Sequence, residues 1–342
     1  MTHVSSPVQR VLHGARVRQL LPAELERLGA TRVALASSAT LAQQTPAVQE
    51  LERALAEVHQ ATYTGLSQHT PEAAVAELAA QLRELGADAV VSVGGGSVID
   101  GCKAAVHQAG AEIVHLALPT TLSGAEFTAS AGITDAASRQ KRRVADRGAA
   151  PRVVFLDPEL SRHTPPRLWL GSGIRALDHA VETICSEVTD PLADHLAQEA
   201  IRRLRQALPA CHRDPGDDSA RYSAQLAAWW AALGLASVPM GPSHSLGKLL
   251  GAPFGIPHGI TSCVLLPVVI ERTAELEPGR IAALAAPFQV GGPRAVAGAC
   301  RELVDELELP TSLAAAGLTR DQLPIYLETV PREWRGPIEA AY

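Results

Sequence analysis

Two residues that could do chemistry stand one helical turn apart in the segment SGIRALDHAVE, residues 172–182. Arg175 and His179 are four positions apart, so an α-helix would present both on one face. A histidine at this spacing from a carboxylate would be half of a metal site, but here the partner position holds a guanidinium. The alternative for Arg175 is an ion pair within the helix with Asp178, three positions later.

Two more histidines lie in apolar segments of the second half. His244 occurs in GPSHSLGKLLG, with Lys248 one helical turn later, and His258 opens HGITSCVLLPVVIE. A polar residue that opens so apolar a helix needs a partner. Taken alone, each histidine is more often a core residue that a neighbour satisfies. Spacing along the sequence does not by itself bring the three together.

A glycine cluster, residues 94–96, separates an expected strand from an expected helix. Glycine lets a backbone approach a phosphate, and a helix start offers N–H groups and the positive end of its dipole. The cluster is not the GxGxxG motif, and a plain tight turn is the alternative. The next expected strand ends in LPTTLSGAE, which begins at residue 118. Two such loops at neighbouring strand ends favour a nucleotide site.

The elements that must position these residues change in character along the chain. Up to about residue 160, strand-like and helix-like segments alternate, which indicates parallel strands joined by crossover helices. From about Thr164 the segments are rich in Ala and Leu with helical spacing. We therefore expect an α/β domain at 1–162 and an all-α domain at 163–342. The expected strands are 31–38, 88–96 and 112–121, the expected helices 71–87 and 97–110, and the expected loops of the helical half 213–222 and 251–259.

Composition narrows the class of protein. The 342 residues are 46% hydrophobic and 19% charged, with a net charge of −6, so we expect no nucleic-acid partner. The five cysteines include no CxxC pair, which favours reduced thiols. We see no signal-peptide core and no apolar run of membrane-spanning length. The expectation is a cytoplasmic protein that does not bind membranes.

Four ordered segments resemble the iron-containing alcohol dehydrogenase family, and most closely its maleylacetate reductase branch. They are GGGSVIDGCKA, LPTTLSGAE, DPELSRHTPPRLWLGSGIRALDHAVE and ASVPMGPSHSLGKLLGAPFGIPHG. The resemblance covers nearly the whole chain. It implies an α/β domain that binds NAD(P), an all-helical domain, the architecture shared with dehydroquinate synthase, and a catalytic cleft between the two.

The resemblance also locates the metal ligands of the family's metal-dependent members. Their Asp and three His correspond to Arg175, His179, His244 and His258, and a further frequent histidine corresponds to Lys248. Asp178 would point about 100° away around the helix, so it does not replace the lost carboxylate. A guanidinium close to a divalent ion is strongly repulsive. We therefore expect no metal and a substrate that carries carboxylates.

The resemblance implies an NADH- or NADPH-dependent reductase that acts on the activated C=C bond of an oxo-dicarboxylate such as maleylacetate. In this interpretation Arg175 and Lys248 bind carboxylates, and the three histidines orient the substrate and donate the proton. The expected cofactor residues are Gly94, Gly95, Gly96 and Ser97 at the pyrophosphate, Asp100 and Lys103 bracing that turn, Thr120 and Thr121 beside the nicotinamide, Lys141 near its ribose and Ser38 near the adenosine.

Other functions remain open at this point. The same architecture could carry out a non-redox elimination or cyclisation on an acidic substrate. It could also be a metal-dependent alcohol dehydrogenase, or a nucleotide-binding homologue without activity. The expected partner is a small anionic molecule, and we expect a homodimer.

Overall fold

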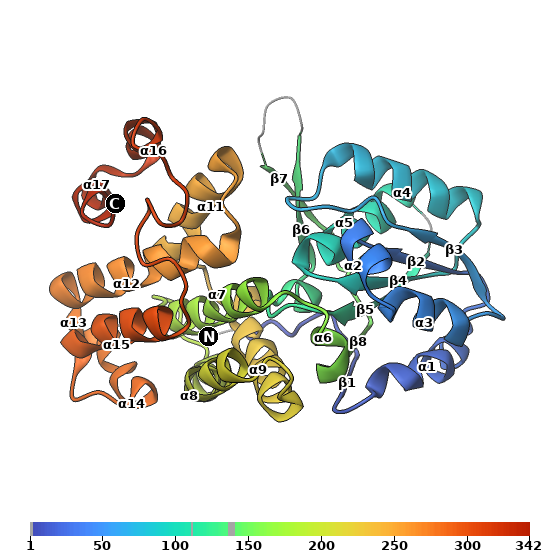
Figure 1. The fold of residues 1–342 in the computed structure, drawn as a ribbon, viewed down its shortest axis with the longest axis horizontal. Helices are drawn as coiled ribbons and strands as arrows, with labels where there is room; N and C mark the ends of the chain where they lie inside the picture. The colour runs from blue at the N-terminus through green and yellow to red at the C-terminus, as the bar shows by residue number, and fades with distance from the viewer. Residues whose placement is uncertain (1–2, 111, 136–140) are drawn as a thin grey trace. The chain divides into compact units, whose positions relative to one another are not determined.

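The computed structural model describes residues 3–110, 112–135 and 141–342 (Figure 1). Their contacts divide the chain into two compact units, one formed by Ser6–Pro165 and the other by Pro166–Tyr342 together with the described residues before Ser6. Those first residues are held to the helical unit by polar contacts. His3 Nδ1 lies 2.7 Å from Asp190 Oδ2, and the backbone N–H of Val4 donates to Ser237 Oγ at 3.1 Å.

The first unit is built on a parallel sheet. Among the described residues, six strands pair in the order β1-β8-β5-β4-β2-β3, and all the pairings are parallel. The strands are β1 (Arg10–His13), β2 (Val33–Ser37), β3 (His59–Tyr63), β4 (Ala89–Gly94), β5 (Val114–Pro119) and β8 (Val153–Leu156). A separate antiparallel hairpin is formed by β6 (Ser130–Thr134) and β7 (Lys141–Ala145).

Helices cover both faces of this sheet, as Figure 1 shows. Alternate residues of β2 point to opposite faces: Ala34 joins a core with α4 and α5, whereas Leu35 joins a core with α1 and α3. This is the doubly covered arrangement that parallel sheets require. The helices are η1 (Val17–Leu20), α1 (Leu21–Arg27), α2 (Ala39–Gln44), α3 (Ala47–Ala54), α4 (Glu72–Glu84), α5 (Gly96–Ala109), η2 (Ala125–Phe127) and α6 (Pro158–Ser161).

The second unit is helical throughout the part of the chain that the structure describes. None of these helices is long and apolar enough to span a membrane. Its long central helix, α7, packs against α8, α9 and α12. The helices are α7 (Pro166–Ile184), α8 (Pro191–Arg213), α9 (Asp218–Ala232), α10 (Gly234–Ser237), α11 (Pro242–Phe254), α12 (His258–Leu276), α13 (Pro278–Ala282), α14 (Ala285–Phe288), α15 (Pro293–Glu306), α16 (Gln322–Thr329) and α17 (Arg332–Glu339).

The predicted fold class, an α/β domain followed by an all-α domain, is confirmed, but the two predicted loops are too long. The first is limited to residues 214–217, because the Asp217 side chain accepts a hydrogen bond from the N–H of Ala220 and starts α9. The second is limited to residues 255–257, because α11 continues to Phe254 and ends at Gly255, whose φ is 72°. The strands β1, β3 and β8 and the β6–β7 hairpin were not among the expected strands.

Two charged side chains are buried near the loop that follows β5. Lys103 is 2% exposed, and its Nζ donates to the carbonyls of Ala125 at 2.9 Å and Ser130 at 2.6 Å. Glu126 is 1% exposed, and its Oε2 has no hydrogen-bond partner among the described residues. Burial raises the pKa of the Glu126 carboxyl to about 7. The folded protein therefore favours the protonated form of this side chain.

This shift predicts a pH-dependent stability. The unfolded chain ionises Glu126 near its ordinary pKa of 4.5, so the stability conferred by the neutral carboxyl is complete below that pH. It is lost as the pH rises through about 7. We expect Glu126→Gln to increase the free energy of unfolding relative to wild type by about 2 kcal/mol more at pH 8 than at pH 5. Urea unfolding at the two pH values measures this difference.

The matched control is Glu84→Gln, which changes an exposed glutamate near the end of α4. Its effect should be the same at both pH values. A Glu126→Gln variant whose stability relative to wild type does not depend on pH would show that the Glu126 carboxyl is ionised in the folded protein at both.

Candidate functional site

The strand order places the glycine cluster at a crossover point of the sheet. β2 lies between β3 and β4, so the chain builds the sheet outward from β2 in both directions. Ser37 of β2 pairs with Val93 of β4, and Gly94 pairs with Pro119 of β5. The carboxyl ends of three neighbouring strands therefore lie side by side, which is where open α/β sheets bind ligands.

The turn after β4 leaves room that only glycine provides. A Cβ on Gly94, whose φ is 154°, would lie 2.9 Å from Val98 Cγ2. A Cβ on Gly95 would lie 3.0 Å from Thr121 Cγ2. Helix α5 then begins at Gly96, and no side chain caps its first N–H groups. Helix α5 is 14 residues long, and its N-terminus has no side-chain cap and directly follows the glycine turn. This arrangement fits the pyrophosphate of a dinucleotide.

Three of the other predicted cofactor residues, Thr120, Ser97 and Ser38, make hydrogen bonds within the α/β unit. Thr120 donates its backbone N–H to the Gly94 carbonyl at 2.9 Å, which ties the glycine turn to the end of β5. Thr121 is 6% exposed, and its Oγ1 has no partner among the described residues. The carbonyl of Ser97 accepts from Thr70 Oγ1 at 3.1 Å. Ser38 caps α2 by accepting from the N–H of Leu41 at 3.3 Å.

Asp100 and Lys103 brace a different segment from the one predicted. Their side chains form an ion pair at 2.7 Å, and Asp100 Oδ2 accepts from the N–H of Gly132 in β6 at 3.2 Å. With the Lys103 bonds to Ala125 and Ser130, the pair fixes the chain after β5 and not the glycine turn itself. Lys141 begins β7, and its side chain lies outside the described part of the structure.

In the helical unit, α7, α11 and α12 pack on one another and carry the three predicted histidines. The rings of His179 and His244 are 6.2 Å apart between centroids. His258 and Lys248 lie near enough to His244 for their charges to contribute to its pKa. A Cβ on Gly251 would lie 2.9 Å from the His258 ring, so glycine makes room for that side chain. We call His179, His244 and His258 the histidine group.

Arg175 is buried within this group and forms the ion pair with Asp178 that the sequence offered as an alternative. Arg175 is 8% exposed. Its Nη1 donates to Asp178 Oδ2 at 2.8 Å and to Ser262 Oγ at 3.0 Å. Its Nη2 is hydrogen-bonded to His244 Nδ1. Because Asp178 offsets its charge, Arg175 contributes less free positive charge to the site than the sequence suggested.

Asp178 is the centre of a polar cluster that the sequence did not reveal. Its side chain is fully buried, and Oδ2 also accepts from Ser243 Oγ at 3.0 Å and from Ser262 Oγ at 2.6 Å. Glu182, one turn further along α7, accepts from the backbone N–H of His244 at 3.1 Å. Burial and the charge of Asp178 raise the pKa of Glu182 to about 8. These contacts join α7, α11 and α12.

Two of the histidines are held neutral. Burial and the charge of Arg175 lower the pKa of His179 well below its usual value. The same two causes lower the pKa of His244. The predicted imidazole with a pKa near neutrality is therefore wrong for both residues in the protein without substrate. His258 is partly exposed.

The residues of the histidine group do not fit a divalent metal. The guanidinium of Arg175 is hydrogen-bonded to the ring of His244, so a positive charge already lies against a ring that a metal would need as a ligand. Asp178 already accepts three hydrogen bonds on one oxygen. Over the described residues, no group of three or more His, Cys, Asp and Glu side chains is arranged to hold a metal ion.

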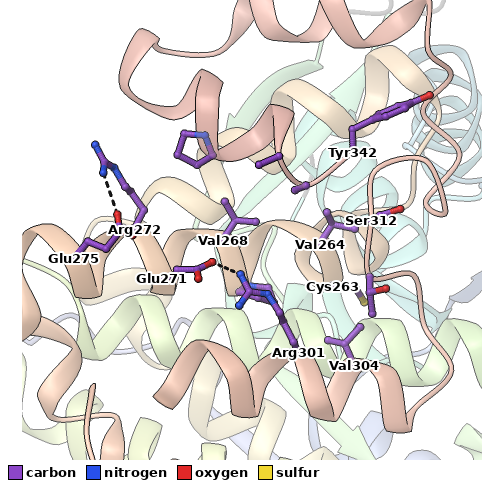
Figure 2. Close-up of a pocket in the computed structure, with 15 residues that line it drawn as sticks. Cys263, Val264, Val268, Glu271, Arg272, Glu275, Arg301, Val304, Ser312 and Tyr342 are labelled. Atoms are coloured by element: carbon purple, nitrogen blue, oxygen red, sulfur yellow. Dashed lines mark hydrogen bonds and ion pairs between the residues drawn. The ribbon is translucent and has the colours of Figure 1, made fainter. Parts of the chain in front are cut away.

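A separate cavity of about 370 Å³ lies elsewhere in the helical unit, along α12 and α15 (Figure 2). Its floor is apolar, with Val264, Val268 and Val304, and two ion pairs, Glu271–Arg301 and Arg272–Glu275, lie at its side. None of the predicted site residues lines it. It therefore adds nothing to the chemistry of the histidine group.

Comparison with known proteins agrees with this geometry. The model of the iron-containing alcohol dehydrogenases matches residues 8–158, and that of the C-terminal domain of the same family matches residues 170–332. Maleylacetate reductase 2 of Cupriavidus pinatubonensis is 35% identical over 90% of this chain and 83% of its own. Maleylacetate reductase 1 of Rhodococcus opacus is 35% identical over 92% of this chain and 85% of its own.

Solved structures give the same result. The crystal structure of maleylacetate reductase from Agrobacterium tumefaciens has a TM-score of 0.90 and 29% identity, covering 100% of this chain and 98% of that one. The chain therefore belongs to the iron-containing alcohol dehydrogenase family, in its maleylacetate reductase branch.

Proposed function

We propose that this protein is an NADH- or NADPH-dependent reductase that reduces the activated C=C bond of an oxo-dicarboxylate such as maleylacetate, without a metal ion. One observation carries the proposal beyond the family: the guanidinium of Arg175 is bound to His244 where a metal-dependent relative would need a ligand. The relatives at 35% identity are maleylacetate reductases, which supports this substrate class. A cytoplasmic homodimer is part of the proposal.

The glycine turn is the proposed cofactor site. Gly94, Gly95, Gly96 and Ser97 would bind the pyrophosphate through the backbone and the start of α5, with Thr121 beside them. When bound, the nicotinamide supplies the hydride. Ser38 stands at the end of β2, next to this turn in the sheet, and is the proposed neighbour of the adenosine.

The histidine group is the proposed substrate site. Lys248 is exposed on α11 and supplies a positive charge for a substrate carboxylate. The neutral rings of His179 and His244 orient the substrate, and His258 is the proposed proton donor. The hydride adds to one carbon of the C=C bond and the proton to the other, so the reaction consumes one reduced cofactor per substrate molecule.

The direct test is the oxidation of NADH and NADPH, followed by absorbance, with a panel of compounds. We expect turnover with maleylacetate and much slower turnover with unsaturated keto acids that carry one carboxylate. Product analysis should show the saturated 3-oxo-dicarboxylate. Turnover with simple aldehydes or alcohols but not with maleylacetate would contradict the substrate class, and a product formed without cofactor oxidation would show a non-redox reaction.

The cofactor site predicts the effect of a side chain at Gly95. In Gly95→Val a branched side chain would occupy the turn that the pyrophosphate must approach, beside Thr121. We expect the affinity for NADH, measured by calorimetry, to fall by about 10-fold or more. Gly298→Val is the matched control, because a Cβ at Gly298 in α15 meets nothing within 4 Å. An unchanged affinity in a folded Gly95→Val protein would exclude the glycine turn as the phosphate site.

The proposed metal-free mechanism predicts resistance to chelators. We expect the EDTA-treated enzyme to keep its activity and elemental analysis to find far less than one metal ion per chain, because Arg175 repels a cation at His244. Arg175→Asp serves as the comparison, since it restores a carboxylate one turn before His179 and should take up zinc. About one tightly held metal per wild-type chain, with activity lost on its removal, would overturn the metal-free mechanism.

A further inference from the structure

The hydrogen bond between Arg175 and His244 determines which nitrogen of His244 carries a proton. A guanidinium has only donors, so Nη2 must donate and His244 Nδ1 must accept. A neutral imidazole has one N–H group, and with Nδ1 as the acceptor that group is at Nε2. We propose that His244 is held in the Nε2–H tautomer and donates this N–H to an oxygen of the substrate. This inference rests on the proposed function of the histidine group.

The donors and acceptors behind Arg175 are consistent with a fixed guanidinium. The hydroxyl of Ser262 donates its hydrogen to Asp178 Oδ2 at 2.6 Å and accepts from Arg175 Nη1 at 3.0 Å. Ser243 donates to the same carboxylate oxygen at 3.0 Å. Each hydroxyl hydrogen is therefore used once, and Nη1 has two acceptors. These contacts hold the guanidinium in one orientation, although the other carboxylate oxygen, Asp178 Oδ1, has no hydrogen-bond partner among the described residues.

The backbone of His244 is fixed from another side. Glu182 Oε1 accepts from the His244 N–H at 3.1 Å, at the start of α11. The His244 ring is therefore held at Nδ1 by Arg175, and the His244 backbone is held by Glu182. His244 is partly exposed, whereas Arg175 and Asp178 are buried. In this arrangement Asp178 and Ser262 are positioning residues, and His244 is the group that reaches the substrate.

The tautomer restricts the substrate group that can face His244. An Nε2–H group requires an acceptor, such as a carboxylate or a carbonyl oxygen, and discriminates against ammonium groups. It also means that His244 stabilises negative charge on that oxygen and does not remove a proton from the substrate. A donor held in place by a cation is suited to the enolate that forms when a hydride adds to an activated C=C bond.

The tautomer is measured directly by NMR of protein labelled with ¹⁵N-histidine, with His244→Gln to assign the signals. We expect the His244 signals of a neutral ring with the proton on Nε2, and we expect maleate, an unsaturated dicarboxylate, to shift the Nε2–H proton. A ring protonated at Nδ1, or a maleate response confined to other histidines, would overturn the proposal. The Nε2–H tautomer with its maleate response in a protein without reductase activity would support the tautomer and contradict the proposed function.

A graded set of serine variants tests the positioning role. Ser262→Ala removes an acceptor from Arg175 and a donor from Asp178, so we expect mixed His244 tautomers and a fall of about 10-fold in kcat/KM. Ser243→Ala removes only a donor to Asp178, and we expect a smaller fall, of about 3-fold. Ser245→Ala is the control, because this exposed hydroxyl on α11 donates only to the Gly241 carbonyl.

The order of the three variants separates positioning from general destabilisation. A structural role alone would lower the unfolding temperature without changing the His244 tautomer in the folded protein. Unchanged tautomer and kcat/KM in folded Ser262→Ala would overturn the positioning role. Should Ser262→Ala fail to fold, Ser243→Ala and the wild-type spectrum still decide the proposal, since both report on the same carboxylate and ring.

Discussion

The buried ion pair between Arg175 and Asp178 is the interaction on which the histidine group depends. Removing two charges from water costs several kcal/mol per ion, which their attraction offsets only with good geometry and further hydrogen bonds. Here Ser243 of α11 and Ser262 of α12 supply those hydrogen bonds. The pair therefore does more than neutralise a charge on α7: it requires α11 and α12 to bring their hydroxyls to the same point. The same hydrogen bonds to Asp178 therefore link α7 to α11 and α12 and stabilise the charges of the Arg175–Asp178 pair.

The Arg175–Asp178 pair also changes what the positive charge of Arg175 can do for a substrate. The family resemblance implies that Arg175 and Lys248 lie beside the histidine group, which suggests two positive charges for an anionic substrate. In the structure Asp178 offsets the first charge, and only Lys248 is exposed. Arg175 instead provides an oriented hydrogen bond. Its Nη1 donates to Asp178, which fixes the guanidinium, and its Nη2 is hydrogen-bonded to His244 Nδ1. A hydrogen bond from a charged donor is stronger in a buried site than in water, and its fixed direction makes it more selective.

The sequence predicted the α/β half where its signals are local. Glycines 94–96 and the continuous apolar run of β4 show a buried strand and a tight turn without reference to any other segment. Strand β3 is only partly buried, and β1 is a four-residue strand at the edge of the sheet, so neither has such a run. Their assignment depends on pairing with distant strands, which a single segment does not reveal.

The polar cluster around Asp178 was not predictable for a different reason. Asp178 does point about 100° away from His179 around the helix, but that direction brings it against Arg175, Ser243 and Ser262. Arg175 lies three positions before Asp178, so the two side chains meet on the helix surface. Ser243 and Ser262 are 65 and 84 residues away from Asp178, and nothing in their own segments marks them as its partners.

The two proposed sites differ in how easily their chemistry can change. The glycine turn would bind a phosphate through backbone N–H groups in the space that its missing side chains leave, so this proposed site depends on the conformation of the chain. The histidine group acts through side chains whose partners come from three helices. Under the proposed function, the residue at position 175 would determine whether that group holds a metal or the observed hydrogen-bond network. Substrate chemistry would then depend on a few buried polar contacts and not on the architecture that carries them.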